Sequence, residues 1–485
     1  LVLMSDEHNP KMLGCAGHNM VRTPNLDGLA ARGTRFSAAY TTCPICVPAR
    51  ASFATGQYVH QNGYWDNAIA YDGRVESWGH RLQAAGMRCE SIGKLHYRQE
   101  SDTTGFDAQH IPMHVKDGVG MVHHSIRGQF PEFTMPEPQS AGGIVLSAGI
   151  GESEYTRYDR KIAELACDWL REAGDRHDTH QTPWVLFVSF VTPHYPLMAP
   201  EEFFQFYDVD AMPSPKLDPS NGYTPHAWLS TLMSRQADHT VSPEQHRLAI
   251  AAYLALCTFM DAQVGRVLQA LSDAGFSQQT RIVYTSDHGE NAGTRGMWGK
   301  SVHYEESGGI PLIVAGDGVP VGKVCSTPVT LVDVYPSILN AVGLPADETG
   351  TRPGRSWFDL AQTPDDPERL AFSEYHAAGS PSGSFMVRKG SYKYIYYVGY
   401  APELFDLTSD PEELTDLAQD PAYADIVQAC DSELRAIVTP EDADRRAKAA
   451  QKALVESRGG PEVVMNNLIT TKNYTPVPDE VEAKL

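Results

Sequence analysis

The sequence predicts an α/β protein with a large mixed, mainly parallel sheet flanked by helices and a smaller C-terminal α+β subdomain. Apolar strand-like runs alternate with amphipathic helical segments up to residue 365, which is typical of parallel sheets joined by crossover helices. The run 184–191 is apolar almost throughout, as in a strand buried on both faces. After about residue 360 the pattern changes to a hairpin and a helix. We therefore expect a main domain at 1–365, a subdomain with a small antiparallel sheet and a helix at 366–458, and an extended tail at 459–485.

The individual elements follow from apolar periodicity and from residues that begin or end helices. Thr23 and Pro24 are typical of a helix start, and Gly33 is typical of a helix end. In chain order we expect strands at 1–5, 88–93, 184–191, 281–286 and 310–315, and helices at 23–33, 76–85, 153–173 and 243–274. In the C-terminal part, 384–398 predicts a hairpin and 423–438 a helix.

The composition narrows the choice of partners and of compartment. A formal net charge of −22, from 39 basic and 61 acidic residues, argues against nucleic acid or an anionic membrane as a partner. No apolar stretch reaches about 20 residues, so we expect no membrane-spanning helix. The eight cysteines are scattered and indicate reduced thiols more than a disulfide framework. We expect a cytoplasmic protein, with the periplasm as the alternative because a signal peptide could precede the first residue.

The run 43–56 contains the strongest candidate for a nucleophile. It places Cys46 two residues before Pro48 and four before Arg50, at a predicted helix start. Backbone N–H groups and the helix dipole favour negative charge there, which suits a nucleophile or a bound anion. Three alternatives stay open at this point: a redox pair of Cys43 with Cys46, half of a zinc site, or two small buried hydrophobic residues.

Charged and metal-ligating side chains follow four of the predicted strands. They are Asp6, Lys94, His96, His194, Asp287 and His288. In open α/β sheets, ligands bind outside the carboxyl ends of the strands. Each residue alone could be a helix cap or a turn former. Together, and with Cys46 at a helix start, they predict an active site at this edge of the sheet.

These motifs resemble the type I sulfatases of the alkaline phosphatase superfamily, near the branch of choline-sulfatases and phosphonate monoester hydrolases. The pattern Cys46-x-Pro-x-Arg50 resembles the nucleophile motif of that family. Further ordered elements that match are 4–8, 93–97, 192–196, 286–290, 297–300, 304–307 and 403–414. The resemblance implies an arylsulfatase-like hydrolase of sulfuric esters in which Cys46 is oxidised to formylglycine.

The resemblance also implies a metal site. Asp6, Asp287, His288 and the modified Cys46 should hold one divalent metal, and hard carboxylate oxygens suit Ca²⁺. Many sulfatases have asparagine where this chain has His288, and an imidazole ligand opens the site to Mn²⁺. Many also have a second aspartate at the position of Glu7, so whether Glu7 is a ligand stays open.

The family resemblance assigns roles to the other residues of the site. Arg50 should orient the nucleophile. The cationic and amide groups that should hold the sulfate oxygens are Lys94, Lys300 and Asn67. His194 should protonate the departing alcohol or phenol after the hydrated formylglycine attacks sulfur in line. His96 should then take a proton from the second hydroxyl, so that the aldehyde forms again and sulfate leaves.

Other functions and partners remain as expectations. The alternatives are a phosphonate monoester or phosphodiester hydrolase on the same scaffold, a promiscuous enzyme, a dithiol oxidoreductase that uses Cys43, and a catalytically silent metal-binding protein. Loops at 100–152 and 196–240 should govern substrate choice, with Tyr97, Tyr195, Met198 and Trp298 as candidates for an apolar wall. The expected partners are a small-molecule sulfate ester, a formylglycine-generating enzyme, and further copies of the chain bound through the tail.

Overall fold

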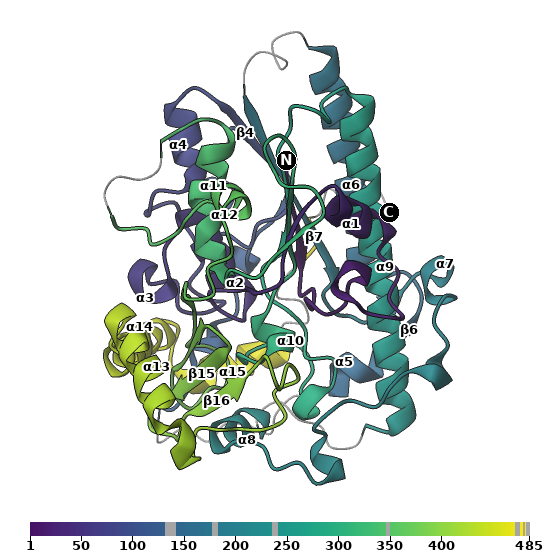
Figure 1. Cartoon of the computed structure of the whole chain (residues 1–485). Helices are drawn as coiled ribbons and strands as arrows, with labels where there is room; N and C mark the ends of the chain where they lie inside the picture. Colours follow the sequence, from purple (N-terminus) through teal and green to yellow (C-terminus); the bar gives the residue numbers. More distant parts are fainter. Residues whose placement is uncertain are drawn as a thin grey trace.

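The computed structural model describes residues 1–130, 142–176, 183–234, 241–345, 350–470, 476–478 and 481. Its centre is an eight-stranded sheet in the order β11-β2-β10-β9-β1-β7-β4-β5 (Figure 1). These strands are β1 (Val2–Asp6), β2 (Gly33–Phe36), β4 (Arg88–Lys94), β5 (Ala108–Met113), β7 (Trp184–Pro193), β9 (Ile282–Ser286), β10 (Leu312–Ala315) and β11 (Lys323–Cys325). Neighbours pair in parallel except at β10, which is antiparallel to both β9 and β2. The prediction of a mixed, mainly parallel sheet is confirmed.

Helices cover both faces of this sheet. One face packs against α1 (Pro24–Ala31), α6 (Glu154–Asp175) and α9 (Pro243–Asp273), and the other against α2 (Cys46–Thr55), α4 (Trp78–Ala84), α11 (Val334–Ala341) and α12 (Trp357–Gln362). Alternate residues at the start of the chain, in and just before β1, pack into the two cores. Val2 and Met4 pack into one core, while Leu1 and Leu3 pack into the other. This alternation explains the uninterrupted apolar start of the chain, because both faces of the strand are buried.

The helix α9 is long and apolar enough to cross a membrane by length and composition alone. However, 83% of its most apolar window is buried inside the fold. Its side chains join two of the hydrophobic cores, among them Met260 and Val264 next to α6 and Tyr253 near the start of the chain. Burial of this kind is typical of the central helix of a packed domain.

A second sheet follows the main domain in the chain. It is antiparallel and comprises β13 (Ala371–Tyr375), β14 (Ser384–Lys389), β15 (Tyr392–Tyr397) and β16 (Glu403–Asp406). The helices α13 (Ala424–Ile437), α14 (Pro440–Ser457) and α15 (Pro461–Thr470) come next, and Figure 1 shows α13 and α14 beside this sheet. The predicted hairpin and the predicted helix at 423–438 are therefore confirmed.

The expectation of an extended tail is wrong for 461–470, which forms α15. Pro461 begins the helix, and Val464 and Met465 pack against Ile126 and Val455. These apolar contacts hold the segment in helical form. Most of the tail beyond Thr470 lies outside the described residues, so its role between copies of the chain stays a prediction.

The first helix differs from the prediction at both of its ends. Its first N–H groups are satisfied by another helix, because Asp261 of α9 accepts hydrogen bonds from the backbone of Asn25 at 3.2 Å and Leu26 at 2.8 Å. The hydroxyl of Thr23 does not cap the helix within the described chain and donates to Asp27 instead. Gly33 does not end the helix but begins β2, where a Cβ would lie 2.2 Å from the carbonyl oxygen of Val314.

Shorter elements lie in the connections between these strands and helices. The strands are β3 (Ala39–Tyr40), β6 (Gly149–Ile150), β8 (Met198–Ala199) and β12 (Val329–Thr330), and the helices are α3 (Val59–Asn62), α5 (Gly142–Leu146), α7 (Glu201–Phe204), α8 (Ala227–Met233) and α10 (Glu305–Gly308). A 3-10 helix, η3 (Val122–Ser125), lies next to α14 and α15.

Candidate active site

The predicted site residues converge at the carboxyl ends of the central strands. Asp6 and Lys94 are the last residues of β1 and β4, Asp287 and His288 follow β9, and His194 follows β7. Because β9, β1, β7 and β4 are parallel neighbours, these side chains meet at one edge of the sheet. Cys46 comes to the same place as the first residue of α2.

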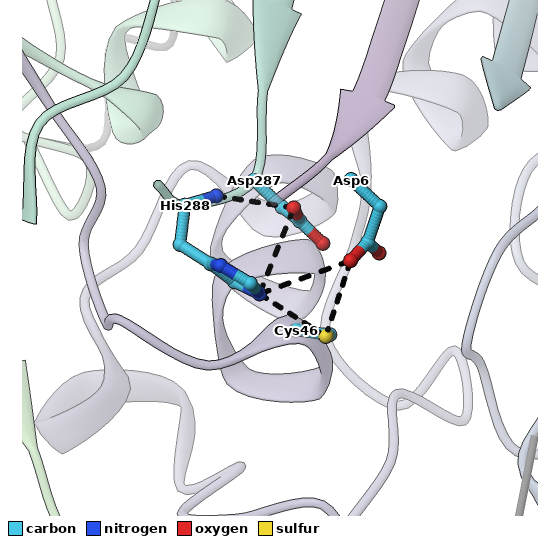
Figure 2. Close-up of side chains that lie close together, drawn as sticks. All are labelled: Asp6, Cys46, Asp287 and His288. Carbon is cyan, nitrogen blue, oxygen red and sulfur yellow. Dashed lines mark hydrogen bonds and ion pairs between the residues drawn. The ribbon is translucent and has the colours of Figure 1, made fainter. Parts of the chain in front are cut away.

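Four of these side chains form a compact group of metal-ligating atoms. One ligand atom each from Asp6, Cys46, Asp287 and His288 lies within 4.8 Å of the others, and all four residues are buried. The Cys46 sulfur is 3.1 Å from Nε2 of His288 and 3.6 Å from Oδ1 of Asp6. Figure 2 shows the four side chains pointing toward one another between two strand ends and a helix start.

Arg50, one helical turn after Cys46, fixes the two carboxylates. Its guanidinium donates to Oδ2 of Asp287 at 2.8 Å and to Oδ2 of Asp6 at 3.0 Å. It also donates to the carbonyl oxygen of Lys94 at 2.8 Å and to Oγ of Ser189 at 2.9 Å. Since Arg50 takes one oxygen of each carboxylate, the other oxygens are left toward Cys46 and His288. Two carboxylate oxygens and an imidazole nitrogen in this arrangement fit a divalent metal.

The charges of this group are not balanced by the protein alone. Burial and the neighbouring Asp6 raise the pKa of Asp287 to about 6. Burial would lower the pKa of His288, but Asp287 and Cys46 raise it to about 9. Burial is the larger cause of the rise at Asp287, and negatively charged neighbours contribute to both rises. A divalent cation would supply the missing positive charge.

The two cysteines of the 43–56 run have opposite environments. Burial opposes ionisation of Cys46, yet the charges of Lys300 and Lys94 hold the pKa of this thiol well below its usual value. Cys43 packs in a hydrophobic cluster, and burial raises the pKa of its thiol well above the usual value. Cys46 is thus the reactive thiol and Cys43 an inert one, which argues against a redox pair.

A second layer of charged groups lies beside the ligand group. Nζ of Lys94 is 2.6 Å from Oδ2 of Asp6, and Nζ of Lys300 is 2.8 Å from Oε2 of Glu7. The same oxygen of Glu7 is 3.3 Å from Nε2 of His194. The side chain of Glu7 therefore contacts a lysine and a histidine of the site, a role that its position in the sequence did not reveal.

The loop before Lys300 is anchored by a buried carboxyl group. Oε1 of Glu290 accepts the backbone N–H of Ala292 at 2.8 Å and that of Gly299 at 2.6 Å. Burial, together with the nearby charge of Glu7, raises the pKa of Glu290 well above its usual value. These two hydrogen bonds close the loop and place Lys300 opposite Glu7.

The two predicted acid–base histidines differ in their partners. Burial and the charge of Lys94 lower the pKa of His96 to about 3, and neither ring nitrogen has a hydrogen-bond partner among the described residues. His96 is therefore a neutral base. His194 is held by Nδ1, which lies 2.6 Å from the carbonyl oxygen of Tyr195, so its Nε2 faces Glu7.

A cavity of about 680 Å³ opens above this group. Its lining includes Cys46, Asn67, His96, Met121, His123, His124, Glu152, Ser153, Glu154, Tyr155, Arg157, His194, Tyr195, Pro196, Met198 and Lys300. Tyr195 and Met198 thus line the cavity as predicted, whereas Tyr97 and Trp298 are buried in hydrophobic cores. The predicted specificity loops supply part of the wall, and their segments 131–141 and 235–240 lie outside the described residues.

Sequence reasoning missed several residues of this wall. Met121, His123 and His124 come from η3 and the turn before it, and Arg157 comes from the first turns of α6. The adjacent pair His123–His124 and the position of Arg157 near a helix start were the signals available in the sequence. Neither distinguishes a cavity wall from an ordinary surface.

Comparison with known proteins agrees with this geometry. A family model described as Sulfatase matches residues 1–344, and a model described as N-sulphoglucosamine sulphohydrolase, C-terminal, matches residues 293–439. A choline-sulfatase of Rhizobium meliloti is 31% identical over 432 residues, which cover 87% of this chain and 82% of that protein. Human arylsulfatase K is 27% identical over 467 residues, which cover 90% of this chain and 82% of that protein.

Solved structures share the fold. The phosphonate monoester hydrolase of Agrobacterium radiobacter superposes with a TM-score of 0.72 at 23% identity, covering 90% of this chain and 94% of that one. A 2-O glycosaminoglycan sulfatase, BT1596, superposes with a TM-score of 0.68 at 22% identity, covering 92% of each chain. At these identities the likeness concerns the fold alone.

Proposed function

This chain belongs to the sulfatase family and is a sulfuric ester hydrolase, and we propose that Cys46, oxidised to formylglycine, is its nucleophile. The supporting observation is the place of the Cys46 sulfur: it begins a helix, lies 3.1 Å from His288 and 3.6 Å from Asp6, and opens on the cavity. The hydrated aldehyde of formylglycine supplies one hydroxyl that attacks sulfur and a second that lets sulfate leave.

A divalent metal held by Asp6, Asp287, His288 and residue 46 belongs to this proposal. When bound, the metal lowers the pKa of the attacking hydroxyl and neutralises part of the charge of the ester. The imidazole among the ligands favours Mn²⁺, while the two carboxylates also suit Ca²⁺. We expect the purified protein to contain about one of these ions per chain.

Three side chains are proposed to hold the sulfate group: Lys300 and Asn67 line the cavity, and Lys94 lies beside it, with Nζ 2.6 Å from Oδ2 of Asp6. The hydrogen-bond donors are the ammonium groups of Lys94 and Lys300 and the amide of Asn67. Their positions are already fixed, so they do not have to move when negative charge shifts onto the sulfate oxygens. All three are at most 9% exposed, so water screens their charges little. Arg50 does not reach the cavity and instead orients the carboxylates beneath residue 46.

The two histidines are proposed to move protons at opposite ends of the reaction. Nδ1 of His194 is engaged with the carbonyl oxygen of Tyr195, so the proton that reaches the departing alcohol is the one on Nε2. Oε2 of Glu7 lies 3.3 Å from this Nε2. His96 is neutral and faces the same cavity, and it accepts the proton that residue 46 gives up when sulfate departs.

Two measurements test the proposal. The mass of the tryptic peptide 36–50 should show that the sulfur of residue 46 is replaced by an aldehyde oxygen. Cys46→Ala should hydrolyse 4-nitrophenyl sulfate at no more than background rate while its circular dichroism spectrum stays that of the wild type. An unmodified peptide in a fully active enzyme, or retained turnover in Cys46→Ala, would contradict the proposal.

The same assay separates the alternative activity. Phosphonate monoester hydrolases share this fold, so a phenyl phosphonate monoester is the matched comparison substrate. We expect kcat/KM to be larger for the sulfate ester. A larger value for the phosphonate would reassign the natural substrate without changing the roles of the residues.

Maturation and location complete the proposal. Formylglycine at position 46 requires an enzyme that oxidises the cysteine, and this enzyme is the expected protein partner. All eight cysteines of the structure are free thiols, which supports a reducing compartment such as the cytoplasm.

A further inference from the structure

The helix α14 reaches from the C-terminal part of the chain to the back of the substrate cavity. The two family models end at residues 344 and 439, so α14, which begins at Pro440, lies beyond both. Its side chain Gln451 is fully buried, and it meets two segments that line the cavity. One segment is the loop around Asn67, and the other is the stretch 121–127.

Every polar group of the Gln451 amide is used. Nε2 donates to Oδ2 of Asp66 at 2.9 Å and to the carbonyl oxygen of His376 at 2.7 Å. Oε1 accepts the Nε–H of Arg127 at 3.0 Å. The amide therefore has a single satisfied orientation, with its donor toward a carboxylate and its acceptor toward a guanidinium.

Asp66 transmits this contact to the substrate-binding amide. It is fully buried, accepts the backbone N–H of Ala68 at 2.9 Å and precedes Asn67 directly. Oδ1 of Asn67 accepts the N–H of Val47 at 3.2 Å, next to the nucleophile position. This bond turns Nδ2 of Asn67 toward the cavity wall, where it lies 3.9 Å from Sδ of Met121.

Arg127 fixes the second segment. Besides Gln451, its guanidinium contacts Oγ of Ser380 at 3.1 Å and Oδ1 of Asp444 at 3.3 Å. Residue 444 is one of the first residues of α14, so this helix holds Arg127 at two points. The stretch ahead of Arg127 includes Met121, whose backbone N–H donates to the carbonyl oxygen of Asn67 at 3.2 Å.

We infer that Gln451 is a positioning residue for the substrate: through Asp66 and Arg127 it sets where Asn67 and the 121–124 wall meet the ester. The two segments are far apart in the sequence, and within the described chain this amide bonds to a carboxylate beside one and a guanidinium at the end of the other. The inference rests on the proposed role of Asn67 in holding sulfate oxygens. Binding is affected because the wall is misplaced while residue 46 and the metal ligands are untouched.

The substitution Gln451→Glu tests this with little change of shape. A carboxylate at this position still pairs with Arg127 but faces the carboxylate of Asp66 in place of a donor. We expect KM for 4-nitrophenyl sulfate to rise about tenfold, which is a loss of about 1.4 kcal/mol in binding. The value of kcat should change less than twofold, whereas a merely structural defect would lower the active fraction and hence kcat.

A second substitution should rescue the first. In Q451E/D66N the amide at position 66 donates to the carboxylate at 451, while the carbonyl oxygen of His376 still lacks the donor that Gln451 supplied. We expect KM to return to within about threefold of the wild type. Lys452→Gln is the matched control, since it removes an exposed ion pair with Glu456 on the same helix and should leave both constants unchanged.

A double-mutant cycle shows whether Gln451 acts through Asn67. In an Asn67→Ala background, Gln451→Glu should raise KM clearly less than in the wild type, because one of the two parts that it positions is gone and only the 121–124 wall remains. A tenfold effect that persists in this background would overturn the inference, as would a KM for Gln451→Glu within twofold of the wild type. If Gln451→Glu does not fold, Gln451→Met, of similar volume, removes the same hydrogen bonds and is judged by the same criteria.

Failure of this inference is distinguishable from failure of the proposed function. Cys46→Ala reports on the nucleophile independently of α14. If Cys46→Ala is inactive and Asn67→Ala has wild-type kinetics, the function stands and the inference about Gln451 falls. If Cys46→Ala is active, the mechanism itself is wrong, whatever Gln451→Glu does.

Discussion

Two buried groups of carboxylates and bases in this molecule use similar residues to different ends. The first, the catalytic floor, is made of Asp6, Asp287, His288 and Arg50. The second, the subdomain triad, is made of His60, Glu374 and His376. All seven residues are buried, so burial of charge does not by itself mark an active site.

The difference lies in how the carboxylate oxygens are used. In the triad, each oxygen of Glu374 has a histidine partner: Nδ1 of His60 at 2.8 Å and Nε2 of His376 at 2.9 Å. Although burial would raise the pKa of Glu374, these two histidines hold it well below its usual value. The carboxylate is satisfied, and none of the three residues is among those that line the described cavity.

In the catalytic floor, Arg50 satisfies only one oxygen of each carboxylate. The pKa of Asp287 stays raised by burial and by Asp6. Its other oxygen accepts the backbone N–H groups of Glu7 at 3.3 Å and His288 at 3.0 Å, whereas the other oxygen of Asp6 lies 3.6 Å from the Cys46 thiol, which opens on the cavity. Carboxylate oxygens that lie among other metal-ligating atoms, beside a cavity, therefore distinguish the floor from the triad.

Removing ligand capacity from the floor should have the largest effect. Asp287→Asn keeps the shape but removes a charge that Arg50 and the metal both require. We expect kcat/KM for an aryl sulfate to fall by about 10³-fold, with loss of bound metal measured by elemental analysis. Activity within tenfold of the wild type would show that the floor is as structural as the triad.

The next effect concerns proton transfer. His194→Ala should lower kcat about 10²-fold for an alkyl sulfate ester, whose leaving group must be protonated. For 4-nitrophenyl sulfate, which departs as a stable anion, the loss should be less than tenfold. Equal losses for both esters would mean that His194 acts on binding rather than as the acid, and the two rates are compared in a single assay.

The triad should respond in stability and not in rate. Glu374→Gln leaves two histidines without their carboxylate, which should lower the free energy of unfolding by about 3 kcal/mol. The kcat of the folded fraction should be unchanged. Glu433→Gln, which breaks an exposed pair with Lys389 in the same subdomain, is the control and should cost less than about 1 kcal/mol. A loss of kcat in Glu374→Gln would show that the triad contributes to the reaction and is not only structural.

The smallest effect is a pH dependence at the edge of the triad. Burial lowers the pKa of His303 to about 3, while an unfolded histidine titrates near about 6.5. Between these values the unfolded state binds the extra proton, so stability falls as the pH decreases, by up to about 1.4 kcal/mol per pH unit. Urea unfolding at pH 5, 6 and 7 should show a shallower slope for His303→Gln than for the wild type. An identical slope would mean that His303 is protonated in the folded protein.

Local patterns in the sequence were enough to predict the catalytic floor. Asp6 and Asp287 each follow an apolar run, and parallel pairing of buried strands leaves such residues at one edge of the sheet. Cys46 was found because Pro48 marks the helix start beside it. These signals are short-range, and so a single sequence contains them.

Contacts between distant segments could not be predicted in this way. Gln451 and Asp66 are 385 residues apart, and nothing in either neighbourhood indicates the other. The helix that includes Gln451 was missed because its buried face is formed mainly by small residues such as Ala443 and Ala447, which give little apolar periodicity. Glu7 stayed ambiguous for a related reason: its adopted φ of 65°, which turns it toward Lys300, is set by the fold around it.

The ion pairs of Arg50 with both aspartates also affect how easily the divalent metal can be removed and replaced. The guanidinium of Arg50 pairs with one oxygen of each aspartate, so it offsets part of the repulsion between Asp6 and Asp287 when no metal is bound. We therefore expect that the metal can be removed and replaced without unfolding the chain, so that different metals can be compared in the same protein.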